Sequence, residues 1–144
     1  MALTVKKITL WRRESGDRPG LMAETLRPLA GYGASLNVAM GYRQPGGTTA
    51  VIEVSPVSGK KAVAAAESVG LGASTIPTLL VEGDDRPGLG YALARAIADA
   101  GIDLDFLVAQ VIGRKFSAIF GFGKEADARR ATTLIKKAGR AGKK

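Results

Sequence analysis

The pattern of hydrophobic and polar positions predicts the same series of elements twice. Each half shows a strand-like segment, a helical segment, two strand-like segments and a second helical segment. In the first half these segments cover residues 5–13, 20–32, 34–42, 48–55 and 58–69. In the second half they cover residues 76–82, 88–100, 102–112, 116–123 and 125–138. The order β-α-β-β-α is that of a ferredoxin-like α+β unit.

A short motif shows that the two halves are copies. Asp17-Arg18-Pro19-Gly20-Leu21 returns unchanged sixty-eight positions later as Asp85-Arg86-Pro87-Gly88-Leu89. The match extends in the same frame without a gap, so that Ala50 meets Ala118. Because only two copies are present, we predict two tandem domains, residues 1–70 and 71–144, instead of a solenoid.

The last strand of a ferredoxin-like unit is hard to place in either half. Only residues 70–84 separate the first unit's second helix from the repeated motif, and the second unit ends in a basic segment without strand character. We expect a short or shared final strand in the first unit and none in the second. The missing edge strand would leave unpaired backbone that another chain could cover.

Composition removes several classes of chemistry. The chain has no cysteine and no histidine, which excludes disulfides and leaves serine triads, thiol hydrolases and zinc sites without a required member. We expect no catalysis and no cofactor. No segment reaches the roughly 20 apolar residues of a membrane span. We therefore expect a cytoplasmic protein with no membrane partner.

The net charge of +8 raises the alternative of a nucleic-acid-associated regulator. Five of the 21 basic residues lie in residues 136–144, however, and without them the second half has a net charge of −1. We interpret residues 136–144 as a frayed, solubilising tail and do not expect nucleic acid as a partner. A carboxylate-based enzyme ranks last, because no activated nucleophile or acid–base pair is visible.

The repeated motif suggests a binding site for a small charged molecule. Glycine at a helix N-terminus leaves the following amides open to a carboxylate, as expected for Gly20 and Gly88. Asp17 and Asp85 lie beside those amides and could bind an ammonium group, so a zwitterion would fit. The alternative is that each aspartate caps its helix and each glycine only permits the turn.

The motif before a helix, followed by a Gly-Ile-Asp-Leu-like start of the next strand, resembles the ACT domain. This resemblance covers residues 3–70 and 73–138 and implies a sensor, most often of amino acids, that regulates metabolic enzymes and some transcription factors. It also implies two units with their sheets joined side by side and the helices on one face. The expected partners are an amino acid, a second copy of the chain in a homodimer, and a regulated enzyme.

The resemblance implies that the loop of one unit and a strand of its neighbour hold the ligand between them. The implied ligand-binding residues are Asp17, Gly20, Leu21, Ser35, Asp85, Gly88, Leu89 and Asp103. Asp17 would face Asp103, and Asp85 would face Ser35. Neither Ser35 nor Asp103 is the asparagine of the family pattern, and Ser15 and Gly83 stand where some members have histidine.

Two other patterns have competing interpretations. Phe116, Phe120 and Phe122 could form an RNA-binding face, but the opposite orientation of Glu53 in the first copy indicates that the phenylalanines face the core. Asp103 and Asp105, with Asp84 and Asp85 nearby, could hold Mg²⁺ or Ca²⁺, although a solvated polar face explains them better.

Overall fold

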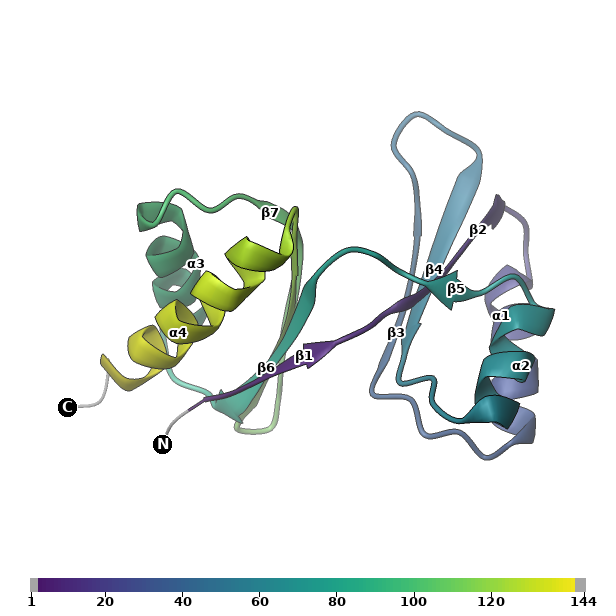
Figure 1. Cartoon of the computed structure of the whole chain (residues 1–144), viewed down its shortest axis with the longest axis horizontal. Helices are drawn as coiled ribbons and strands as arrows, with labels where there is room; N and C mark the ends of the chain where they lie inside the picture. The colour runs from purple at the N-terminus through teal and green to yellow at the C-terminus, as the bar shows by residue number, and fades with distance from the viewer. Residues whose placement is uncertain (1–2, 142–144) are drawn as a thin grey trace. The chain divides into compact units, whose positions relative to one another are not determined.

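The computed structural model describes residues 3–141 as an α+β protein, as the sequence predicts. Its elements are β1 (Thr4–Ile8), β2 (Trp11–Gly16), α1 (Leu21–Gly31), β3 (Val38–Arg43), β4 (Thr49–Ser55), α2 (Lys60–Ser68), β5 (Gly72–Ala73), β6 (Thr78–Asp84), α3 (Leu89–Asp99), β7 (Leu104–Ile112), β8 (Lys115–Phe122) and α4 (Glu125–Ala141). They form two compact units (Figure 1). We call Thr9–Thr75 the inserted unit, and the chain up to Ile8 together with that from Ile76 the split unit.

The inserted unit is a four-stranded antiparallel sheet covered by two helices. Its strands lie in the order β3-β4-β2-β5, and α1 and α2 lie on one face of the sheet (Figure 1). Leu21 and Leu29 of α1 and Ala66 of α2 pack against Ile52 and Val54 of β4 to form the core. The final strand β5 has only two residues, which confirms the short strand expected there.

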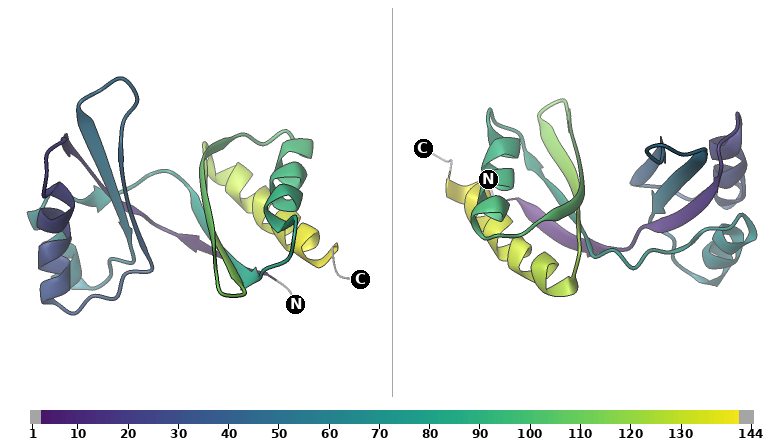
Figure 2. Two further views of the ribbon diagram at one scale, coloured as in Figure 1. Left: turned by 180° about the vertical axis from the view of Figure 1, so that it is seen from behind. Right: turned by 90° about the horizontal axis from the view of Figure 1, so that it is seen from above.

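The split unit repeats this architecture with a larger core. Its sheet has the order β1-β6-β8-β7, with α3 and α4 on one face (Figure 2). Phe116, Phe120 and Phe122 are buried with Leu93 of α3 and Ile135 of α4. This confirms the core interpretation of the phenylalanines.

The N-terminal strand corrects two expectations. The segment predicted as one strand over residues 5–13 is two strands, and only β2 joins the inserted unit's sheet. The other, β1, pairs antiparallel with β6 and occupies the edge that we expected to be vacant and covered by another chain. The split unit therefore begins with the first residues of the chain, which differs from the division at residue 70. Each sheet therefore has four strands. In the split unit, β1 supplies hydrogen-bond partners for the edge of β6 from the same chain.

The β3–β4 hairpin of the inserted unit and the β7–β8 hairpin of the split unit differ in length. The gapless alignment of the two copies is therefore wrong over the strand that follows the hairpin, β4. Gly41 pairs with Ile52 in the inserted unit, whereas Ala109 pairs with Ala118 in the split unit. Ala118 thus matches Ile52, not Ala50. The core prediction survives because a two-residue shift is one full strand period and leaves every side chain on its original face.

Residues 136–141 of the basic tail are helical instead of frayed, and residues 142–144 lie outside the described residues. The last helix, α4, extends to Ala141, and Gly139 is buried within it against Leu3. Arg86 donates hydrogen bonds to the carbonyl groups of Ala138 and Gly139, 3.1 and 3.5 Å away. These contacts hold the end of α4 in place. Within the described residues, no helix combines the length and apolar character needed to cross a lipid bilayer.

The contact between Leu3 and Gly139 gives a test of the split unit. A Cβ atom at position 139 would lie 2.7 Å from Leu3 Cδ1 and 2.8 Å from Leu3 Cγ. We predict that Leu3→Ala lowers the free energy of unfolding by about 2–3 kcal/mol. Gly139→Ala should destabilise the wild type but stabilise the Leu3→Ala variant by up to about 1 kcal/mol, because alanine favours helix. Urea denaturation of the four proteins checks this, and equal effects of Gly139→Ala in both backgrounds would contradict it.

Candidate functional site

The loop between the first strand and the first helix of each unit has the same backbone conformation. Gly20 and Gly88 are the N-cap residues of α1 and α3, with left-handed φ angles of 87° and 79°. The Asp17 amide donates a hydrogen bond to the Thr48 carbonyl at 2.7 Å, and the Asp85 amide donates one to the Arg114 carbonyl at 2.8 Å. Each loop is therefore tied to the hairpin formed by the next two strands.

The interpretation of the aspartates as helix caps is wrong. Neither α1 nor α3 receives a side-chain hydrogen bond at its N-cap. In α1 the Leu21 amide donates to the Arg18 carbonyl at 3.3 Å, and the Glu24 amide donates to the Gly20 carbonyl at 2.9 Å. The amides between them, of Met22 and Ala23, form no hydrogen bond with the described residues. These two amides can therefore donate hydrogen bonds to a bound anion.

A pocket of about 390 Å³ lies beside this loop in the inserted unit. Its lining residues come from the loop, the first turn of α1 and the facing parts of β3 and β4: Asp17, Arg18, Gly20, Leu21, Met22, Gly41, Tyr42, Arg43, Ala50, Val51 and Ile52. The structure thus brings three predicted residues, Asp17, Gly20 and Leu21, into one cavity. Sequence reasoning missed the wall formed by β3 and β4, because cross-strand neighbours of the loop leave no local signal.

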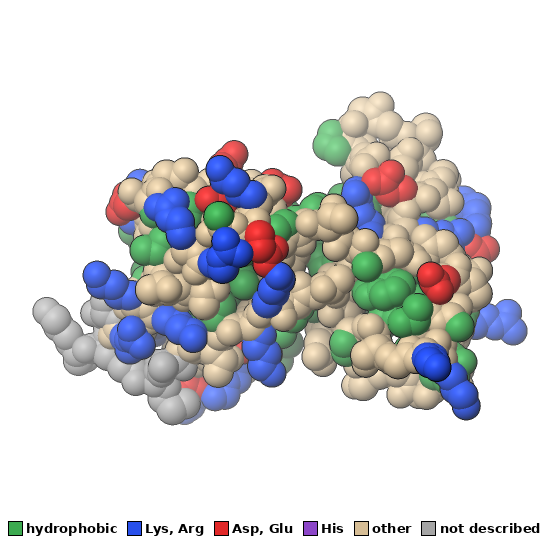
Figure 3. Space-filling model, viewed as in Figure 1, with side chains coloured by type: hydrophobic (Ala, Val, Ile, Leu, Met, Phe, Trp, Pro, Cys, Tyr) green, Lys and Arg blue, Asp and Glu red, His purple; other side chains and the backbone are tan. Residues whose placement is uncertain are grey.

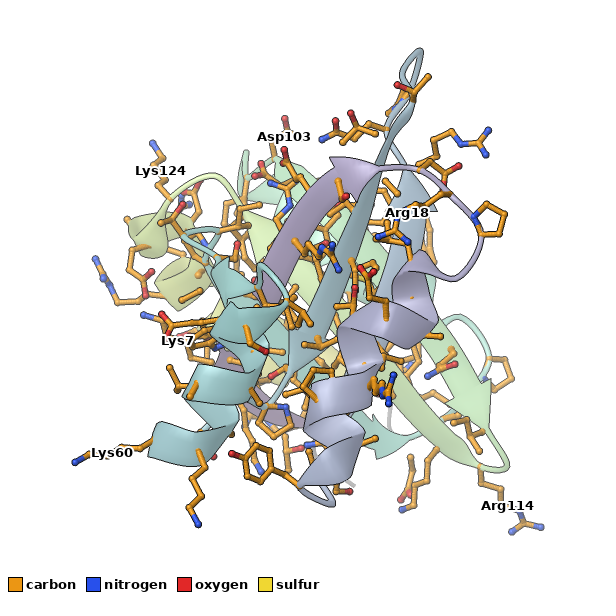
Figure 4. All side chains as sticks on the ribbon, turned by 90° about the vertical axis from the view of Figure 1, so that its right-hand side faces the viewer. Lys7, Arg18, Lys60, Asp103, Arg114 and Lys124 are labelled. Carbon is orange, nitrogen blue, oxygen red and sulfur yellow. The ribbon has the colours of Figure 1, made fainter. Side chains whose placement is uncertain are left out.

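Two ion pairs define the charged end of the pocket. Asp17 Oδ2 accepts hydrogen bonds from Arg43 Nε at 2.9 Å and from Arg43 Nη2 at 2.6 Å. Arg18 Nη2 lies 2.9 and 2.8 Å from the two carboxylate oxygens of Glu24. Figure 4 shows Arg18 beside the first turn of α1. Charges of both signs therefore lie where the free amides begin.

Arg13 anchors the second of these ion pairs from beneath α1. Its Nη1 lies 2.9 Å from Glu24 Oε2 and donates to the hydroxyl of buried Thr25 at 2.8 Å. Hydrogen bonds from Arg18 and then from Arg13 hold the pKa of the Glu24 carboxyl below its ordinary value of 4.5. Glu24 is therefore ionised at neutral pH and holds Arg18 at the pocket.

The inner end of the pocket is apolar, with Met22 as one wall. A Cβ atom at Gly41 would lie 2.6 Å from Met22 Cε, so the methionine side chain lies directly over the glycine. Leu21 and Ile52 are buried beside them. Because a methionine side chain is unbranched and flexible, this wall can adjust to a ligand.

The other predicted site residues lie elsewhere. Ser35 lines a second depression of about 470 Å³, with Tyr32, Ser58 and Lys60, at the far end of α1 from the loop. Lys60 points away from α2 into solvent (Figure 4). Asp103 is exposed after α3, and its Oδ1 accepts a hydrogen bond from the Leu104 amide at 3.0 Å.

In the split unit, Gly88 and buried Leu89 begin α3 next to exposed Asp85. No ion pair joins the Asp85 side chain to any residue between 3 and 141. The pairings of Asp17 with Asp103 and of Asp85 with Ser35 stay predictions.

Glu53 lies on the sheet face away from the helices, as predicted, but it does not face solvent. Its side chain is only 1% exposed. Its Oε2 accepts a hydrogen bond from the Tyr42 hydroxyl at 3.0 Å, while its Oε1 lies 4.0 Å from Arg12 Nε. Burial, followed by the negative charge of Glu53, raises the pKa of the Tyr42 hydroxyl.

The remaining patterns do not form sites in the described part of the chain. No group of three or more ligating side chains lies together there, and Asp84 pairs with Lys115. A bulge between Leu104 and Phe106 breaks the strand alternation at Asp105. Figure 3 shows basic side chains spread over one face of the split unit, with acidic side chains among them.

No family model and no curated protein matches the chain. Solved structures do match, at low identity. The regulatory subunit of aspartate kinase from Thermus thermophilus has a TM-score of 0.65 and 18% identity, and the match covers 96% of this chain and 97% of that one. A Bacteroides thetaiotaomicron protein has a TM-score of 0.70 and 11% identity over 92% and 98% of the two chains.

A third match is a putative C-terminal regulatory domain of aspartate kinase from Porphyromonas gingivalis, with a TM-score of 0.59 and 10% identity over 96% of both chains. The tandem ACT-like fold expected from the sequence is confirmed.

The ion pair of Glu24 predicts a specific pH dependence. Because its pKa is lowered in the folded protein, its contribution to stability is complete above pH 4.5 and disappears as the pH falls through the folded-state pKa. Glu24→Gln should therefore be less stable than wild type at pH 7 and equally stable in acid below that pKa. Urea unfolding from pH 7 to pH 3 measures this difference. Glu67→Gln, on an exposed position of α2, is the control, and a gap that persists in strong acid would refute the prediction.

Proposed function

We propose that this protein is a non-catalytic regulatory protein that binds an amino acid at the loop pocket of the inserted unit. The observation that carries this proposal is the 390 Å³ cavity at the repeated motif. It combines free helix amides, a carboxylate and two guanidinium groups around an apolar interior.

The pocket chemistry favours a zwitterion. The Met22 and Ala23 amides and the Arg43 guanidinium can donate hydrogen bonds to a ligand carboxylate. Only Oδ2 of Asp17 is engaged by Arg43, so Oδ1 can accept from a ligand ammonium. A zwitterion would thus satisfy both signs of charge without disrupting the ion pair.

The structural neighbours support a regulatory role. Several are regulatory subunits or domains of aspartate kinase, and they share the fold over almost the entire chain. We propose that the protein acts on a partner enzyme and that a neighbouring ACT-like unit completes the ligand site at Asp17, with Asp103 as the contributing residue. Ligand binding would then shift the population toward the arrangement that binds it better.

Ligand-induced stabilisation tests the function. We predict that at least one of the twenty amino acids raises the melting temperature when added at millimolar concentration. A ligand at one hundred times its dissociation constant stabilises the folded state by about 2.7 kcal/mol. The amide derivative of the same amino acid, which lacks the carboxylate, is the matched control and should give a much smaller shift. If no amino acid changes the melting temperature, the proposed function is wrong.

We further propose that the chain forms a homodimer through β7. This nine-residue strand is a sheet edge, and it exposes Leu107, Val108, Val111 and Ile112 by 40 to 68%. Such an edge is a template for strand pairing. Antiparallel pairing with a second copy, centred on Val108, would place Asp105 opposite Val111, so that like charges do not meet.

Substitution at the centre of β7 tests the dimer. Val108→Lys would place two lysines opposite each other, and we predict that it weakens self-association at least tenfold. Tyr91→Lys, on α3 at a position 72% exposed, is the control and should leave association unchanged. Sedimentation equilibrium measures both variants. Equal association of the three proteins, or a monomeric wild type, would contradict the proposal.

A further inference from the structure

The two repeated motifs share a backbone but differ in the side chains around it. Strand pairing identifies the equivalent positions: Gly41 corresponds to Ala109, Arg43 to Val111, and Ala50 to Phe116. On the helices, Met22 corresponds to Gly90. Four residues that line the pocket of the inserted unit are therefore replaced in the split unit.

Two of these replacements remove the space and the cation. The methyl group of Ala50 leaves the pocket open beneath α1, whereas Phe116 is a buried ring in the core of the split unit, packed in one cluster with Leu89. Arg43 pairs with Asp17, whereas Val111 leaves Asp85 without that partner. The motif of the split unit retains the turn and the free amides of its helix, but it lacks the arginine that would hold a carboxylate beside them.

The pocket of the inserted unit is also polar at one end only. Arg43 pairs with Ala50 in the sheet, next to the hairpin, and Gly41 pairs with Ile52 one strand period further along. The charged residues Asp17 and Arg43 therefore belong to the hairpin end, whereas Met22 and Ile52 line the deeper part. A charged ligand side chain would enter that deeper part without a partner, at a large desolvation cost.

We infer that each chain binds one ligand, at the motif of the inserted unit, and that the ligand is an amino acid with an uncharged, apolar side chain. This inference rests on the proposed function. Met22 and Gly41 determine specificity, because they form the wall that meets the ligand side chain, and the motif of the split unit serves only the fold.

Calorimetric titration with leucine, lysine and aspartate tests the inference. We expect one leucine per chain and binding of lysine and aspartate at least tenfold weaker. Arg43→Val, which introduces the split unit's residue at a site 68% exposed, should weaken leucine binding about tenfold through the loss of a charge-assisted hydrogen bond. Ala50→Phe should abolish binding by filling the pocket. Because Ala50 is buried, circular dichroism must first show that the Ala50→Phe variant folds. If that variant does not fold, the leucine affinity of Arg43→Val alone tests the inference.

Substitutions at the equivalent positions of the split unit distinguish the possible outcomes. Ala109→Gly and Asp85→Asn, both at exposed positions, should leave leucine binding unchanged. Two ligands per chain, or binding that is lost in these variants and retained in Arg43→Val, would overturn the inference while the proposed function stands. Tighter binding of lysine or aspartate than of leucine would contradict the inference that the ligand has an uncharged, apolar side chain. Absence of binding by all twenty amino acids would remove the proposed function and this inference together.

Discussion

The candidate site depends on the turn that leads from the first strand into the first helix. The Asp17 amide is tied to the hairpin at Thr48, and three residues later Gly20 adopts a left-handed conformation that a residue with a side chain rarely adopts. Together these constraints aim the first amides of α1 at the space beside β3. The pocket exists because the helix begins at this point and in this direction.

The same turn stands beside different side chains in the two units. In the inserted unit, Arg13 and Thr25 form a polar network beneath α1 with Glu24. The equivalent residues of the split unit, Val81 and Leu93, are fully buried in an apolar core. The motif's arginine follows this divergence, since Arg18 binds Glu24 whereas Arg86 binds the carbonyl end of α4. The polar network of the inserted unit lies beneath α1 and outside the residues that line the pocket, whereas aromatic rings fill the interior of the split unit.

The first strand shows how the two units depend on one chain. Lys7 forms an ion pair with Glu125, and Leu3 packs on Gly139, so that β1 contacts both the sheet and α4 of the split unit. The inserted unit then occupies the chain between two strands that pair with each other, β1 and β6. The edge that would otherwise invite another chain is closed, which leaves β7 as the apolar edge of that sheet.

The sequence by itself determined the duplication, the element types and the position of the loop. These features depend on local periodicity and on glycine, so that residues a few positions apart are sufficient to predict them. The buried phenylalanines were also predictable, because an error of two residues in the hairpin does not change a strand face.

Only the tertiary structure decided which sheet receives β1, that α4 continues to Ala141, and that Arg43, Gly41 and Ala50 line the pocket beside the loop. Each of these outcomes depends on contacts between segments far apart in the chain. Such contacts do not produce a periodic pattern of hydrophobic residues, so the sequence alone does not predict them.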